Sequence, residues 1–156
     1  MTISTSSFIK FLGPVAAGGT VDIPVTALPS NAQVIQDAYG FAVASVLPEL
    51  QAMPNMGSGT PLYDLCVYNC GASYIINWAP DQPRMDYFKK MREGLGINTF
   101  VGGVVSSTSD ETDSTTLATP DWVKGASIAD LQYLKDPYGR FYLGMMQRMG
   151  SLWGMS

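Results

Sequence analysis

Residues that could support catalysis are few in this chain of 156 residues. It contains 13 acidic residues, two cysteines and no histidine, so the commonest general base and metal ligand is missing. A Ser-His-Asp or Cys-His site is therefore excluded. Asp64 is the nearest candidate for a catalytic carboxylate because it begins an apolar segment, but capping a helix is its more ordinary role there. We predict that the chain is not an enzyme and has no catalytic residues.

The two thiols, Cys66 and Cys70, lie four residues apart in a segment that we expect to be helical. Their side chains would point the same way, which is a poor geometry for a mutual disulfide. A zinc site would need carboxylate partners that this stretch lacks. We therefore expect both cysteines to be reduced packing residues.

Two further patterns suggest bound groups, and neither meets the full requirements. The acidic run Asp110, Glu111 and Asp113 lacks the sixth-position glycine and closing glutamate of a calcium loop. Residues 94–96, Gly-Leu-Gly, precede a β-prone run, which is the wrong order for dinucleotide binding. We predict no metal and no cofactor. The acidic run is instead predicted to be a solvated loop tip that lines a channel or contacts a neighbouring chain.

The composition indicates a surface that other protein chains cover. Only 14% of the residues are charged, against roughly 25% in an average globular protein. The alternative is a monomer whose surface is rich in Ser and Thr. The net charge is −4, and Asp86 and Glu93 interrupt the one dense basic run, at 84–92. Tight binding to DNA is therefore not expected, whereas passive passage of DNA remains open.

No membrane association is expected. Residues 1–7 carry no positive charge and precede no signal-peptide core. The uncharged stretch 65–80 is shorter than a membrane span and contains two Asn residues. These features predict synthesis in the cytosol.

The elements that would position these residues predict a mainly α fold, a small helical bundle over residues 30–150. Gly and Pro residues interrupt residues 1–29, which predicts an extended N-terminal arm. In that arm Phe8, Phe11 and Leu12 would bind a neighbouring subunit. A partly disordered terminus is the alternative.

Three helices are expected before residue 97. Ser30 and Gln33 form a capping-box pattern before an apolar stripe that ends near Pro48. The next helix, from Pro61 to Pro80, is apolar all round, which predicts burial on every side. A chain this short has few elements to surround that helix, so we expect a neighbouring subunit to cover part of it. A short amphipathic helix follows over residues 85–93.

The second half of the chain is predicted to contain an insertion and a helical end. Residues from about 97 to 120 are β-prone and then rich in Ser, Thr and acidic residues, which predicts a β-hairpin or long loop. A short helix over 128–135 precedes a last helix that begins at Asp136-Pro137 and runs to about residue 149. Residues 151–156 form an apolar tail with little core left to fill. The tail is predicted to dock on another chain through Leu152, Trp153 and Met155.

One stretch resembles a known family. Residues 128–143 read IADLQYLKDPYGRFYL, similar to the C-terminal part of head–tail connector (adaptor, or head-completion) proteins of tailed bacteriophages, where an ADLQ.LK helix precedes a PYGR.YL helix. The preceding acidic Ser/Thr loop and Thr-Pro are also similar, and the resemblance extends over residues 30–150. Within the motif, Tyr138 and Arg140 would tie the two C-terminal helices together.

The resemblance implies a structural virion protein, made in the host cytoplasm. It would form a ring of twelve copies under the portal protein and present its lower face to a stopper or tail protein. Double-stranded DNA would pass through the ring without specific binding. Alternatives are another neck, tail-completion or minor capsid protein, an acid-catalysed hydrolase using Asp64, and a small-ligand module. The ligand would lodge among Tyr63, Tyr68, Tyr74 and Trp78.

Overall fold

The chain is mainly helical, as predicted. The computed structural model describes residues 4–53, 61–99, 108–110, 113–115 and 132–149. Short 3-10 helices occupy Val15–Ala17, Pro48–Ala52 and Ile97–Thr99. None of the described helices is both long enough and apolar enough to cross a membrane. The α-helices in the described ranges are α1 (Thr5–Leu12), α2 (Gln33–Ser45), α3 (Leu62–Trp78), α4 (Tyr87–Gly94) and α7 (Pro137–Arg148).

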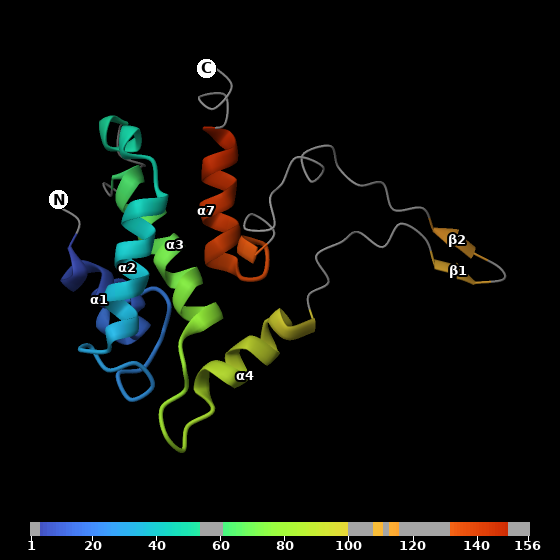
Figure 1. Cartoon of the computed structure of the whole chain (residues 1–156), viewed down its shortest axis with the longest axis horizontal. Coiled ribbons are helices and arrows are strands. Elements are labelled where there is room, and N and C mark those ends of the chain that lie inside the picture. The colour runs from blue at the N-terminus through green and yellow to red at the C-terminus, as the bar shows by residue number, and fades with distance from the viewer. Residues whose placement is uncertain (1–3, 54–60, 100–107, 111–112, 116–131, 150–156) are drawn as a thin grey trace.

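The central element is α3, with α2 and α7 packed along it and with α1 and α4 also in contact (Figure 1). Thirteen of its 17 residues are buried, because apolar side chains leave the helix in every direction. The predicted burial of this helix is confirmed. No neighbouring subunit is needed for these 13 residues, because α1, α2, α4 and α7 of the same chain cover them; cover of the rest of the helix by a neighbour stays a prediction.

The N-terminal segment departs most from the sequence expectation. Residues 5–12 form α1, and the Ser4 hydroxyl caps it by accepting a hydrogen bond from the Ser7 backbone N–H at 3.2 Å. Phe8 is fully buried and fills the space left by Gly71, where an added Cβ would lie 2.7 Å from the Phe8 ring. The prediction of an extended arm over residues 1–29 is therefore wrong for this part. The helical core begins at residue 5 rather than at residue 30.

Helix α2 begins and faces differently from the prediction. Its N-cap is Ala32, which makes no side-chain cap, so Ser30 is not the capping residue. Ile35, Ala38 and Ala42 are buried, whereas Phe41, assigned to the same apolar stripe, is 42% exposed. The helix ends at Ser45, before the predicted stop at Pro48, and Phe41 is left at the surface.

Two three-residue strands pair with each other. Strand β1 (Thr108–Asp110) lies antiparallel to β2 (Asp113–Thr115), with Asp110 opposite Asp113. Residues 100–107, 111–112 and 116–131 lie outside the described residues. The hairpin or long loop predicted over about 97–120 therefore stays a prediction, as does most of the helix predicted over 128–135.

Candidate functional site

A buried carboxylate joins α3 to α7. Asp136 is fully buried at the N-cap of α7, and its Oδ1 accepts hydrogen bonds from the backbone N–H groups of Tyr138 (3.0 Å) and Gly139 (2.8 Å). Its Oδ2 accepts from the Ser73 hydroxyl at 2.7 Å and from the Asn77 side-chain amide at 2.9 Å. One side chain thus caps α7 and binds two polar groups of α3.

The two residues that follow Pro137 complete this junction. A Cβ on Gly139 would collide with the backbone oxygen of Tyr133 and would lie 2.8 Å from the Ser73 hydroxyl oxygen, so α7 approaches this closely only with glycine there. The Tyr138 hydroxyl donates to the Thr20 backbone oxygen at 3.3 Å. Tyr138 therefore ties α7 to the N-terminal segment, whereas Arg140 is exposed.

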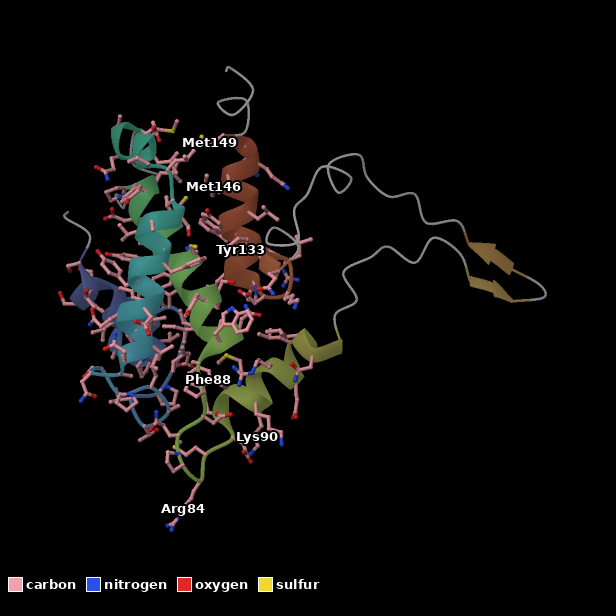
Figure 2. All side chains as sticks on the ribbon, in the orientation of Figure 1. Arg84, Phe88, Lys90, Tyr133, Met146 and Met149 are labelled. Atoms are coloured by element: carbon pink, nitrogen blue, oxygen red, sulfur yellow. The ribbon has the colours of Figure 1, made fainter. Side chains whose placement is uncertain are left out.

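A groove of about 290 Å³ lies beside the junction. The Phe41 and Tyr74 rings are 5.2 Å apart at one wall, and Trp78, at the end of α3, is 59% exposed. Tyr133, labelled in Figure 2, lies near the N-terminal end of α7. The volume is close to the lower end, about 300 Å³, of the range for ligand pockets. The groove is lined by Phe41, Ser73, Tyr74, Asn77, Trp78, Gln132 and Tyr133.

Of these residues, sequence reasoning singled out only Tyr74 and Trp78 as candidates for binding. Ser73 and Asn77 offer a usable signal, because with Asn69 they place polar residues four apart on one face of a largely apolar helix. Their common partner, Asp136, is remote in the sequence and could not be identified. Phe41 gave no signal of exposure.

The apolar residues predicted to hold a neighbour from the N-terminus belong to the core of the same chain. Phe8 is 0% and Leu12 is 2% exposed, so the prediction that they bind another subunit is wrong. Phe11 is partly buried, with its ring 5.5 Å from that of Tyr68 and 6.4 Å from that of Tyr138. All three side chains pack within the chain because they share one face of α1.

The other predicted partner-binding residues stay predictions. Leu152, Trp153 and Met155, together with Glu111, lie outside the described residues. Asp110 and Asp113 are described as facing positions in the paired strands.

The small-ligand hypothesis requires four aromatic residues around one space. Tyr74 and Trp78 do line the groove, whereas Tyr63 and Tyr68 are buried in the core. The Tyr68 ring stacks on Phe8, with ring centroids 5.9 Å apart. A ligand in the groove would therefore contact only two of the four predicted residues.

The groups with the most strongly altered acidity are buried thiols. Burial raises the pKa of Cys66 to about 11. It raises the pKa of Cys70 to about 12, and the Tyr133 hydroxyl oxygen lies 3.7 Å from that sulfur. Burial also raises the pKa of Asp64. A neutral, enclosed thiol is a poor nucleophile and a poor ligand, and the described residues contain no group of three or more His, Cys, Asp or Glu that could hold a metal.

The basic run does not form a surface of one sign. Arg92 donates to the backbone oxygens of Ile76 and Ala79, each at 3.0 Å, and so caps the end of α3. Its other terminal nitrogen lies 3.9 Å from Asp81. The remaining cations, among them Arg84 and Lys90 in Figure 2, are exposed next to exposed acids. This region presents mixed charge: Arg84, Lys89 and Lys90 with Asp86 and Glu93.

Comparisons with known proteins add no relative: models of protein families, curated proteins and solved structures all gave no match to this chain.

Proposed function

We propose that this chain is a structural virion protein of a tailed bacteriophage. It forms a ring at the portal vertex, joins the head to the tail and extends the DNA channel. The support from the sequence is the resemblance of residues 128–143 to head–tail connector proteins. The acidic net charge of −4 suits a wall past which DNA moves without being held.

The observation that carries the proposal is how the described part of this motif is used. Asp136 caps α7 and binds α3, Pro137 occupies the first helical position, and Gly139 permits the close approach of the two segments. The most family-like residues therefore serve folding. A motif that holds two helices together is more typical of a structural protein than of an enzyme.

In this proposal each copy contacts two neighbours, the portal protein above and a stopper or tail protein below. Twelve copies form the ring. The hairpin or loop over about 97–120 lines the channel or contacts a neighbour through Asp110, Glu111 and Asp113. The exposed aromatic residues of the groove, Phe41 and Trp78, supply apolar surface for contact between copies.

A different neck, tail-completion or minor capsid protein is the alternative within virion proteins. Ring stoichiometry and contact with the portal distinguish it. A ligand-binding module is a second candidate, and the groove with Tyr74 and Trp78 favours it. A stable monomer that binds a small aromatic compound in the groove would support that candidate.

The proposal is tested on the parent particle. Antibody-labelled gold against a peptide tag on this chain should mark the junction of head and tail in electron micrographs, and the complex with the portal should have the mass of twelve added copies. The same tag on a major tail protein serves as the control and should mark the tail's length. Label on the capsid faces, or particles without this chain, would overturn the proposal.

A further inference from the structure

The groove presents two partly exposed aromatic side chains at the surface. Trp78 is 59% and Phe41 is 42% exposed. Both line the groove together with Ser73 and Asn77, whose side chains donate hydrogen bonds to Asp136. An exposed aromatic side chain beside a rigid hollow is typical of a contact hot spot. The groove can take an aromatic side chain from outside.

The chain also carries an aromatic side chain without a described position. Trp153 lies in the tail after α7, between Leu152 and Met155. The groove lies at the N-terminal end of α7, because its residues Ser73 and Asn77 bond to the cap of that helix. The tail begins at the other end of α7, after Met149 (Figure 1).

Chain length favours binding between copies over binding within one. Helix α7 has 12 residues, so it is about 18 Å long. The four residues from Met149 to Trp153 span at most about 14 Å when fully extended. Even when the tail runs straight back along the helix, the Trp153 backbone stops about 4 Å short of its own groove. The indole could then enter that groove only from a fully extended tail, which conformational entropy disfavours.

We propose that the groove of one copy binds Trp153 from the tail of a second copy. Because groove and tail lie at opposite ends of α7, the contact is head-to-tail, and repeating it generates a ring when the rotation between copies divides a full turn evenly. The inference rests on the proposed function, and it assigns the contact that would build the ring. Trp78 and Phe41 would flank the incoming indole, and Leu152 would pack at the rim.

A disulfide trap on the full chain tests this contact. Gln132→Cys places a thiol at the groove, and Gly154→Cys places one beside Trp153, so both aromatic anchors remain. Cys66 and Cys70 do not compete, because both are buried with raised pKa values. Mild oxidation of the double variant should give a ladder of covalent multimers on a non-reducing gel.

The matched controls separate a specific contact from random collision. Val15 is 61% exposed and does not line the groove, so Val15→Cys paired with Gly154→Cys should give no ladder. Adding Trp78→Lys to the trapping pair should slow ladder formation about tenfold or more, as expected for loss of a hot-spot aromatic residue. Adding Val15→Lys should leave the rate unchanged.

The cross-linked species on the gel distinguish a contact between copies from a contact within one chain. A monomer that runs faster, with its disulfide closed inside one chain, overturns the proposal, as does the absence of multimers or a ladder indifferent to Trp78→Lys. A product that stops at the dimer supports the groove contact and contradicts the ring, which counts against the proposed function instead. Absence of the gold label from the portal vertex would likewise remove the proposed function alone.

Discussion

Among single residues, Asp136 is expected to contribute strongly to stability, because its carboxylate accepts four hydrogen bonds. Asp136→Ala removes the cap of α7 and leaves the buried Ser73 hydroxyl without its acceptor. A lost cap costs about 1 kcal/mol and each lost hydrogen bond to a charged group about 1.5–3 kcal/mol. We expect the free energy of unfolding, measured in urea, to fall by about 4 kcal/mol.

Two further substitutions give this prediction its controls. Asp136→Asn keeps an oxygen for the cap but points an amide at the Asn77 amide, so a smaller loss of about 2 kcal/mol is expected. Asp37 is exposed and accepts from Gln33 on the same helix, so Asp37→Ala should change the unfolding free energy by about 0.5 kcal/mol or less. Equal effects of all three substitutions would contradict the assigned role.

Two glycines on α7 form a matched pair. Gly139→Ala would press a methyl group against Tyr133 and Ser73, and overpacking of this kind costs about 1–3 kcal/mol. Gly144 has no atom within 4 Å of an added Cβ, so Gly144→Ala should gain up to about 1 kcal/mol from helix propensity. Thermal melts of both variants should shift in opposite directions, and a shift in the same direction would contradict the close approach at Gly139.

At the scale of elements, α1 belongs to the core. The Phe8 ring lies 5.8 Å from that of Tyr39 and is fully buried, so Phe8→Ala should lower the free energy of unfolding by about 3–5 kcal/mol. Val15→Ala, at a position 61% exposed, should change it by about 0.5 kcal/mol or less. Urea unfolding measures both, and an unchanged Phe8→Ala variant would restore the idea of a separate arm.

Elements with strong local signals could be predicted from the sequence. Asp136-Pro137 carries both a capping side chain and a residue suited to the first helical turn, and α7 does begin at Pro137. The apolar residues on every side of α3 predicted its burial without knowledge of which elements would cover it. In both cases the necessary information lies within one short segment.

Elements that depend on distant partners could not be predicted. An eight-residue helix is not stable alone in water, so α1 depends on tertiary packing, such as that of Phe8 into the space left by Gly71, far along the chain. The groove has the same origin, because its floor needs Asp136 opposite Ser73 and Asn77. The polar residues Ser73 and Asn77 on α3 are compatible with a buried polar partner, but nothing near them in the sequence identifies which residue it is.

At the scale of the whole molecule, the helical core is covered by its own chain, and this changes where partners would bind. Among the described helices, α1, α2, α4 and α7 bury 13 of the 17 residues of α3, so the burial of α3 does not require a neighbouring copy. In the proposed ring, contact between copies would use local features. These are the groove around Trp78, the tail after α7 and the acidic run near β1 and β2.

For the acidic run, we expect substitutions to affect assembly with the portal but to have little effect on folding. Changing Asp110 and Asp113 to Asn and Glu111 to Gln moves the net charge from −4 to −1, since three negative charges are removed. Solvated side chains contribute little to folding, so the melting temperature should change by about 2 °C or less. Portal assembly, measured by sedimentation with purified portal rings, should change if the run lines the channel or contacts a neighbour.

Asp136→Asn is the control for this triple variant, because it removes one charge but at a buried position. Its loss of about 2 kcal/mol corresponds to about 4–8 °C in a domain of this size. If the number of charges removed determined stability, the triple variant would show the larger change in melting temperature. If burial of the substituted side chain determines it, Asp136→Asn should show the larger change. A fall of many degrees in the triple variant would mean that the acidic run is packed inside the protein, and the predicted solvated tip would then be wrong.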